Sequence, residues 1–280
     1  MGEEGRSEVD ENTTYKTVQT YFFGMSESPE KLREEAVKNF NETLDLIQKG
    51  KNEEALESLR KAEKTAQDAK DVAILFLTLK TRGQLLQSLG RLEEALETYI
   101  FSLITCEKFH ETDPENKLYL DTLHMNLNNI GNLGNIFLRA DNFPFAQQCY
   151  EIGIEASRKQ LEFHPENKFY QMYVGNTLNN LGELLSKMDQ NEEAKEKYEE
   201  ALKTYSPLLK NHPENSEYLS DTAMTLNNLG ILFSEKGQKA EAKENFEKAL
   251  EVLKNLSEKE PENEKLKEEI SLTLERLEAL

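Results

Sequence analysis

The sequence predicts an all-α fold made of stacked, equivalent helix pairs, and three observations lead to this prediction. The stretch Leu178–Gly182, LNNLG, returns as Leu226–Gly230, and in looser form as Ile130–Gly134. A second marker, Pro-Glu-Asn, begins at Pro114, Pro165, Pro213 and Pro261, with spacings of 51, 48 and 48 residues. Polar turns, each followed by an alanine, recur between these markers. Self-similarity at such a period is typical of repeat architectures.

The N-terminal residues 1–25 are predicted to be an acidic tail that is partly disordered, because their start is polar and lacks periodicity. Large apolar side chains follow at Tyr15, Val18, Tyr21, Phe22, Phe23 and Met25. This aromatic part is a candidate to pack on the first helix. Ser28-Pro29-Glu30 predicts a helix start, with a capping hydroxyl, proline in the first turn and an acid beside it. Residues 26–280 form the predicted repeat domain.

Five polar turns, at 49–52, 89–91, 140–142, 188–191 and 235–238, are each predicted to join the two helices of a pair. Each precedes an alanine at an equivalent place: Ala55, Ala95, Ala146, Ala194 and Ala242. Small side chains at these places let two helices approach closely. The best-defined pair runs from Pro165 to about Asn211.

This pattern resembles the tetratricopeptide repeat. One unit reads Leu178, Leu181-Gly182, Leu185, Ala194, Tyr198 and Ala201. The pattern recurs five times over about nine-tenths of the chain, and Thr43 replaces the glycine in the first unit. The resemblance implies a right-handed α-α superhelix: a solenoid of five helix pairs plus a C-terminal capping helix.

The repeat is longer than the family's unit of about 34 residues. Ala194 precedes Pro213 by 19 residues and Pro213 precedes Gly230 by 17, which indicates that each helix has gained seven residues. Seven residues are about two helical turns, so the apolar face keeps its direction. Both helices between Pro165 and Asn211 are therefore expected to be about 20 residues long. Pro207 is expected to kink or break the second one near Tyr205.

The last helix, from Pro261 on, is predicted to cap the stack. Its apolar stripe is Leu266, Ile270, Leu274 and Leu277. Glu275, Arg276 and Glu278 replace the Asn-Asn and Gly of the earlier units. One apolar and one charged face are what a terminal repeat needs.

Composition excludes several classes of partner. The net charge is −19, with 53 acidic against 34 basic side chains, which argues against nucleic acid and anionic lipid. No apolar run is long enough to span a membrane, and the N-terminus does not resemble a signal peptide. Cys106 and Cys149 lack metal-ligand spacing and fit a reducing cytoplasm. A cytoplasmic protein is expected.

No catalytic constellation is recognisable. The four histidines, His110, His124, His164 and His212, have no accompanying nucleophile or orienting acid. Phosphate-binding, dinucleotide-binding and calcium-binding loops are missing from the sequence pattern. We therefore expect a protein that is not an enzyme, with no cofactor and no metal.

The candidate site residues are asparagines on the first helices of the units. Asparagine is a poor residue inside helices, because its side chain competes for backbone hydrogen bonds. The eight candidates for peptide binding are Asn128, Asn132, Asn135, Asn176, Asn179, Asn180, Asn227 and Asn228. The resemblance implies that first helices line a concave groove, where Asn132, Asn180 and Asn228 touch ligand. An amide can pair with a guest backbone without reading its sequence. The alternative is that these amides tie neighbouring helices together.

Some family members grip a C-terminal carboxylate with amides and cations. The matching places here hold Lys80, Gln84, Asn132, Asn176 and Asn180, so the last two cations of that site are missing. Carboxylate gripping is not expected.

The sequence thus favours a protein-protein interaction scaffold that binds a peptide segment or helix of a partner in its concave groove. Two alternatives remain open: a structural scaffold whose role is self-association, and a regulatory domain of a larger assembly.

Overall fold

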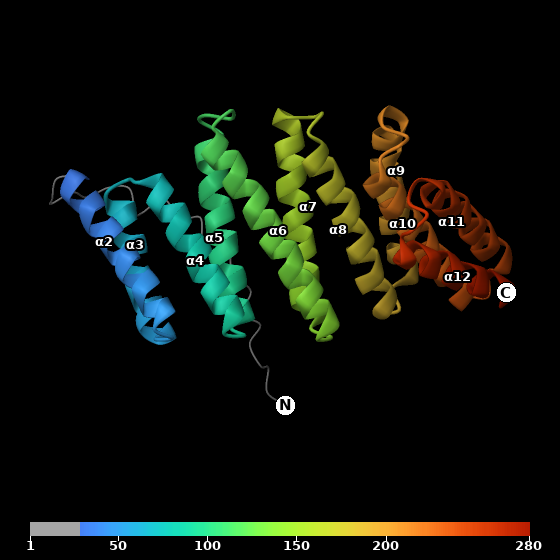
Figure 1. Cartoon of the computed structure of the whole chain (residues 1–280), viewed down its shortest axis with the longest axis horizontal. Helices are drawn as coiled ribbons and strands as arrows, with labels where there is room; N and C mark the ends of the chain where they lie inside the picture. Colours follow the sequence, from blue (N-terminus) through green and yellow to red (C-terminus); the bar gives the residue numbers. More distant parts are fainter. Residues whose placement is uncertain (1–28) are drawn as a thin grey trace. The chain divides into compact units, whose positions relative to one another are not determined.

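The computed structural model describes residues 29–280, and this range contains eleven α-helices and no β-strand (Figure 1). The helices are α2 (Pro29–Gln48), α3 (Asn52–Asp68), α4 (Val72–Ser88), α5 (Leu92–His110), α6 (Lys117–Arg139), α7 (Phe143–Phe163), α8 (Lys168–Lys187), α9 (Asn191–Asn211), α10 (Ser216–Glu235), α11 (Lys239–Lys259) and α12 (Glu264–Glu278). The predicted all-α fold, with five helix pairs and a C-terminal helix, is confirmed. The predicted tail, residues 1–25, lies outside the described residues.

The chain divides into two compact units, unit 1 up to Leu133 and unit 2 from Gly134, with the boundary inside α6. In unit 1, α2 packs on α3 and α4 packs on α5. In unit 2, α8 packs on α9, α10 on α11, and α12 on α11. Each helix thus contacts mainly those next to it in sequence, as expected for a repeat protein.

An aromatic ring lies directly on a glycine in the helix pairs of unit 2. A Cβ atom added at Gly182 would lie 2.7 Å from the Tyr198 ring, and one added at Gly230 would lie 2.5 Å from the Phe246 ring. Ala194, four residues before Tyr198, is fully buried. The glycine and the alanine therefore let the two helices come close enough for the ring to fill the seam.

The first pair solves the same packing problem with different residues. Thr43 stands at the place of the glycine, and Leu59 stands at the place of the ring. Both side chains are fully buried, and the Thr43 hydroxyl donates to the backbone oxygen of Asn39 over 3.0 Å. A smaller partner on α3 leaves room for a side chain on α2.

The helices of the pair from 168 to 211 are 20 and 21 residues long, as predicted. A second glycine–tyrosine contact, between Gly175 and Tyr205, lies seven residues beyond the contact of Gly182 with Tyr198. Because seven residues are two turns, the added length repeats the same contact farther along the seam.

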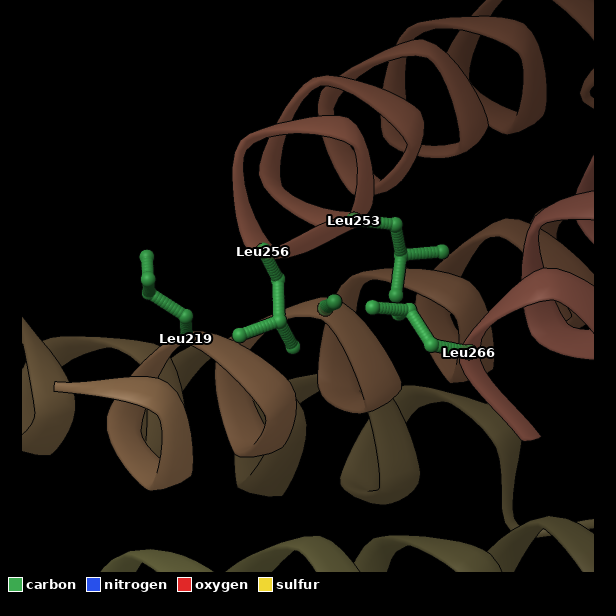
Figure 2. Packing of buried hydrophobic residues seen from close by; sticks show 5 residues of the cluster. Leu219, Leu253, Leu256 and Leu266 are labelled. Atoms are coloured by element: carbon green, nitrogen blue, oxygen red, sulfur yellow. The ribbon is translucent and has the colours of Figure 1, made fainter. Parts of the chain in front are cut away.

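The corresponding place in the next pair belongs to a buried aliphatic cluster. Leu253 and Ala223 are fully buried there, together with Leu219, Leu256 and Leu266 (Figure 2). Figure 2 shows Leu253 of α11 and Leu266 of α12 pointing toward one another, with Leu256 and Leu219 farther along the cluster. Leu266 thereby attaches α12 to the stack, as the predicted cap requires.

Helix α9 continues through Pro207, so of the predicted kink or break near Tyr205 the break does not occur, and the kink stays a prediction. Tyr205 and Leu208 on either side are buried at 0% and 3% exposure and hold the helix in place. Pro207 itself is exposed, so water can satisfy the carbonyl that loses its helical partner.

The Pro-Glu-Asn marker has a structural role at helix starts. The Oδ1 atom of Asn215 accepts a hydrogen bond from the backbone N–H of Tyr218 at 3.0 Å, and Asn263 does the same for Leu266 at 3.2 Å. Asn167 caps α8 in the same way. The marker therefore caps the first helix of a unit, where the free backbone donors need an acceptor.

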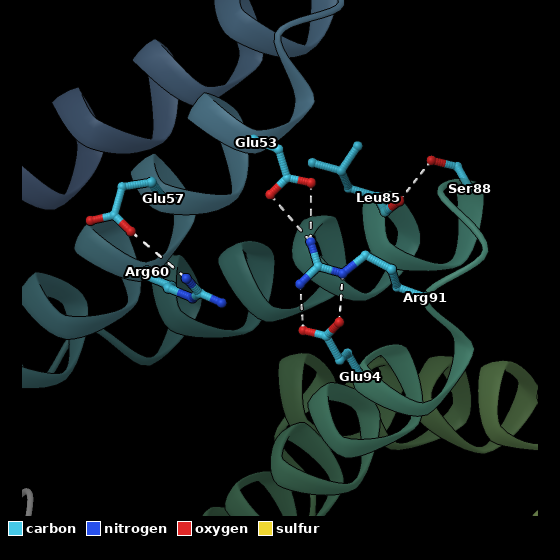
Figure 3. A network of polar contacts seen from close by, with 7 residues as sticks. All are labelled: Glu53, Glu57, Arg60, Leu85, Ser88, Arg91 and Glu94. Carbon is cyan, nitrogen blue, oxygen red and sulfur yellow. Dashed lines mark hydrogen bonds and ion pairs between the residues drawn. The ribbon is translucent and has the colours of Figure 1, made fainter.

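In unit 1, the turn before α5 is held by a charged network (Figure 3). The Arg91 guanidinium contacts Glu94 with an Nε to Oε1 distance of 2.5 Å, and Glu53 on α3 with an Nη1 to Oε1 distance of 3.2 Å. The hydrogen bond from Arg91 lowers the pKa of Glu94. The network links two successive turns, although exposed ion pairs of this kind contribute little stability.

Helix α12 differs from α8 and α10 at one position of its apolar stripe. Leu274, part of the predicted stripe, is 38% exposed, whereas the equivalent Leu178 and Leu226 are 1% and 8% exposed. The earlier pairs each have a second helix, and none follows α12 in the described chain. The cap therefore leaves part of its apolar stripe facing solvent.

Candidate functional site

Unit 2 presents a surface that we call the first-helix face, formed by Asn176 and Asn180 on α8, Met224 and Asn228 on α10, and Leu272 on α12. Residues four apart lie on one side of a helix, which aligns the two members on α8 and the two on α10. Met224 stands 48 residues after Asn176, and Leu272 stands 48 after Met224. The repeat thus places equivalent positions on successive helices.

The eight predicted asparagines differ in exposure. Asn128 and Asn132, on the unit 1 part of α6, are exposed. Four others in unit 2 are partly exposed: Asn135, Asn176, Asn180 and Asn228. Asn179 and Asn227 are buried, at 1% and 9% exposure. The exposed and partly exposed side chains can meet a guest, and the two buried ones have almost no surface to offer.

Several of these amides connect neighbouring first helices. Asn180 Nδ2 donates to Asn135 Oδ1 at 3.2 Å, and Asn228 Nδ2 donates to Asn179 Oδ1 at 3.0 Å. Asn227 exchanges hydrogen bonds with Thr273 of α12, at 2.9 and 3.2 Å. The helix-tying role, weighed as an alternative for these residues, is therefore present in the structure, and it leaves the role in peptide binding open.

The ties use only part of each amide. No hydrogen bond within residues 29–280 engages the Oδ1 atom of Asn180 or that of Asn228. Both side chains are partly exposed. Each can therefore accept a hydrogen bond from a guest while keeping its tie to the neighbouring helix.

Buried tyrosine hydroxyls fix two of the other amides. Tyr205 donates to Asn176 Oδ1 at 2.6 Å, and Tyr150 donates to Asn135 Oδ1 at 2.7 Å. Burial raises the pKa of both tyrosines, so each stays a hydrogen-bond donor at neutral pH. The second helices thus orient amides on the first helices.

A carboxylate lies beside Asn176. Burial raises the pKa of Asp221 to about 6; Glu217 adds to the effect and a hydrogen bond from Asn176 opposes it. The Oδ2 atom of Asp221 is buried and has no partner in the described chain. This side of α10 is therefore acidic, and its charge changes just below neutral pH.

Two exposed apolar side chains on the first-helix face were not predicted from the sequence. Met224 is 43% exposed and Leu272 is 42% exposed. Met224 and Leu272 stand at the same point of the repeat as Asn176, so an alignment of the units would have identified them. The face therefore combines amides with apolar contact area.

A cavity of about 610 Å³ opens elsewhere in unit 2, between α7 and α9, with α8 as its floor. Its lining comprises Glu151, Ile154, Glu155, Arg158, Lys159, Glu162, Leu178, Leu181 and Lys197. The apolar floor is almost fully buried, and the ion pair of Arg158 with Glu200 joins the two walls. The mixed charges around it define no single class of ligand.

Metal sites, membrane-spanning helices and cysteine thiols are the remaining features of residues 29–280 that bear on function. This part of the chain holds no group of three or more His, Cys, Asp and Glu side chains placed to bind a metal ion. None of its helices is sufficiently long and apolar to cross a membrane. Cys106 and Cys149 are buried free thiols, and burial raises the pKa of Cys149 to about 12. Of the residues matched to the carboxylate-gripping site, Lys80, Gln84 and Asn132 belong to unit 1, and Asn176 and Asn180 to unit 2.

Comparison with solved structures gives several similar chains. BtubC (BKLC) from P. vanneervenii has 17% identity and a TM-score of 0.45, covering 91% of this chain and 92% of its own. MamA has 19% identity and a TM-score of 0.42, covering 82% and 96%. YrrB, described as a TPR protein with an unusual peptide-binding site, has 17% identity and a TM-score of 0.40, covering 85% and 94%. At these TM-scores the likenesses carry no conclusion about function.

Comparison with curated proteins gives no match. Comparison with protein families matches residues 173–255 to the tetratricopeptide repeat. This range includes most of α8 and α11 and all of α9 and α10, where the glycine–ring contacts and the buried alanines lie. Residues 173–255 therefore match the tetratricopeptide repeat, and helix pairs with the same glycine–ring contact, at Gly83 with Tyr99 and Gly134 with Tyr150, precede that segment.

Proposed function

We propose that this chain is a non-enzymatic protein-interaction scaffold, and that its first-helix face binds a peptide segment or a helix of a partner protein. The tetratricopeptide repeat is a protein-interaction module, so the family match supports the scaffold role. The observation that carries the proposal is the mixture on the first-helix face: partly exposed amides beside the exposed Met224 and Leu272.

The amides and the apolar side chains have different tasks. Asn180 and Asn228 offer free Oδ1 acceptors to backbone N–H groups of the guest, without selecting its sequence. Met224 and Leu272 offer apolar area to guest side chains, and methionine adapts to varied shapes. In unit 1, Asn128 and Asn132 of α6 are exposed and could offer amides to a guest separately. The buried Asn179 and Asn227 hold the helices that carry the others.

The test begins with affinity capture of a partner, followed by titration of that partner with variants. The double variant Asn180→Ala with Asn228→Ala removes two amide contacts. At about 0.5–1.5 kcal/mol each, the loss weakens binding by about 5-fold to 150-fold if the effects add. Alanine also raises helix propensity, so circular dichroism should report an intact fold.

The matched control is Asn245→Ala on the second helix α11, where the amide is also partly exposed and donates to the Glu241 backbone oxygen. It should leave affinity unchanged. Equal affinities for wild type and a folded double variant would refute the proposal. A double variant that unfolds would favour the helix-tying role alone.

Self-association is the second candidate function, and one observation favours it. Leu272 and Leu274 of α12 are 42% and 38% exposed, and α12 has no second helix in the described chain. A second copy could cover them. We also infer a cytoplasmic location, which the free, buried thiols of Cys106 and Cys149 support.

A further inference from the structure

The carboxyl group of Asp221 lies within the first-helix face of unit 2. Asp221 stands three residues before Met224 and seven before Asn228, which places all three on one side of α10. Its side chain is partly exposed, and a hydrogen bond from Asn176 of α8 reaches it. The acid therefore sits beside the amides and the apolar side chain that this face offers to a guest.

Tyr205 of α9 determines which way the Asn176 amide points. The Tyr205 hydroxyl donates to Asn176 Oδ1 at 2.6 Å, and burial raises the pKa of Tyr205, so the hydroxyl keeps its proton at neutral pH. With its oxygen occupied, the amide turns its NH₂ group to Asp221 as a donor. The buried second helix thus orients the polar group that holds the carboxyl in place.

The Asp221 carboxyl lacks a cation in the described chain. Its Oδ2 atom is buried and has no hydrogen-bond partner there. The charged group that acts on it is Glu217 of α10, which is also acidic; α8 contributes the amide of Asn176, and within residues 29–280 no lysine or arginine of any helix lowers its pKa. Native proteins rarely leave a buried carboxylate oxygen unpaired, because its lost hydrogen bonds to water are then uncompensated.

The rest of the face also offers acceptors. The free Oδ1 atoms of Asn180 and Asn228 are acceptors, and Met224 adds exposed apolar area. Glu269 of α12, 48 residues after Asp221, repeats the acid at the equivalent place. A complementary guest therefore supplies hydrogen-bond donors. A lysine or arginine fits best at Asp221, since its apolar stem can lie along Met224 while its charged head meets the carboxylate.

We propose that Asp221 selects guests that carry a basic side chain, and that a lysine or arginine of the partner segment pairs with its carboxylate on the first-helix face. This inference rests on the function proposed above and adds the charge of the partner to it. Asn180 and Asn228 bind the guest backbone, and Asp221 reads one of its side chains.

The pairing has a pH dependence whose sign follows from the ionised carboxylate. Burial raises the pKa of Asp221 to about 6, and a guest cation lowers that pKa in the complex, so binding releases a proton. Affinity should therefore rise by about five-fold to ten-fold between pH 5 and pH 7 and stay constant above that. Asp221→Asn should abolish this rise.

Selection from a displayed library of random peptides on the full chain, at about pH 7.5 where Asp221 is ionised, tests the proposal. Peptides selected by wild type should share a lysine or arginine at a fixed position, and those selected by Asp221→Asn should not. The matched control is Glu251→Gln, which removes the same charge from an exposed position on the second helix α11. It should select the same peptides as wild type.

Titration of one selected peptide then isolates the ion pair. The peptide is made with its basic residue and with an uncharged analogue of similar length, norleucine for lysine or citrulline for arginine. The analogue should bind wild type and Glu251→Gln about ten-fold more weakly, and should bind Asp221→Asn as well as the basic peptide does. This cycle separates the pair from the general attraction of a chain of net charge −19 for basic peptides.

The outcomes distinguish this inference from the function on which it rests. Selected peptides that need Asn180 and Asn228 but share no basic residue would overturn the inference and leave the proposed function standing. A basic residue whose removal weakens binding to wild type and Asp221→Asn equally would also overturn it. If no peptide is selected, or if the variant Asn180→Ala with Asn228→Ala binds the peptides as wild type does, the proposed function fails and this inference fails with it.

Discussion

Asp221, which lies beside Asn176 of the first-helix face, illustrates how one residue can set a pH response. Its pKa is raised to about 6 from 3.8, chiefly by burial, and the charged group facing it, Glu217, is also acidic. A carboxyl whose folded pKa is raised favours the protonated folded state. Its effect on stability is therefore absent below about pH 4, appears as pH rises to about 6, and is a constant penalty above that.

The Asp221→Asn variant removes this response. The shift corresponds to about 3 kcal/mol, which we reduce to about 1–2 kcal/mol because the Asp221 side chain is only partly buried. We expect the stability of the variant relative to wild type to rise by that amount between pH 4 and pH 7. Urea unfolding at each pH measures it, and a difference independent of pH would contradict the assignment.

Gly182 is the second residue whose surroundings predict a measurable effect. An alanine Cβ there would lie 2.7 Å from the buried Tyr198 ring. Overpacking of this kind costs about 1–3 kcal/mol, partly offset by the better helix propensity of alanine. We expect Gly182→Ala to lower the free energy of unfolding by about 1–2 kcal/mol.

In the first helix pair, Thr43 and Leu59 stand in place of the glycine and the ring, and both are buried. The same replacement of the ring in the later pair supplies the matched control for Gly182→Ala. In a Tyr198→Leu background the ring is gone, so adding Gly182→Ala should cost nothing or stabilise slightly. A double-mutant cycle from denaturant unfolding gives the coupling. If Gly182→Ala lowers the free energy of unfolding equally in both backgrounds, the Tyr198 ring is not the reason why position 182 needs glycine.

At the scale of single helices, the sequence predicted lengths and seams well. The spacing of Ala194, Pro213 and Gly230 predicted helices of about 20 residues, because helix periodicity ties the added length to whole turns. The asparagine of the Pro-Glu-Asn marker recurs with the same repeat, and it caps the first helix of a unit. These features are local, so a pattern along the chain contains them.

The errors and omissions have physical causes too. Of the kink or break predicted at Pro207, the break does not occur, because Tyr205 and Leu208 on either side of it are buried and keep α9 continuous. The hydrogen bond from Asn228 to Asn179 joins residues 49 apart, and no single-helix pattern specifies it. The exposure of Leu274 depends on which helix lies beside it. Contacts between helices decide these points, and the sequence pattern describes each helix by itself.

At the scale of the whole molecule, net charge opposes self-association. Each copy carries −19, so copies repel one another at low ionic strength. We expect a monomeric mass by light scattering at about 10 mM salt, where the Debye length is about 30 Å. Association through α12 would appear as salt is raised, and Leu274→Lys would prevent it. A dimer at low salt would contradict the repulsion expected from the net charge, and a dimer that survives Leu274→Lys would exclude α12 as the contact.

The neighbour-to-neighbour packing within unit 2 has a mechanical consequence. Among the described residues, α8 packs on α7 at one side, and α8 and α9 contact α10 at the other, so the main contacts of this pair are with its neighbours in sequence. Tension applied at the ends of this unit therefore meets one small interface at a time. The pair from Lys168 to Asn211 would release about 150 Å of extended chain when it yields. We expect such a unit to lengthen in steps under tension, and to shorten again as its helix–helix interfaces re-form.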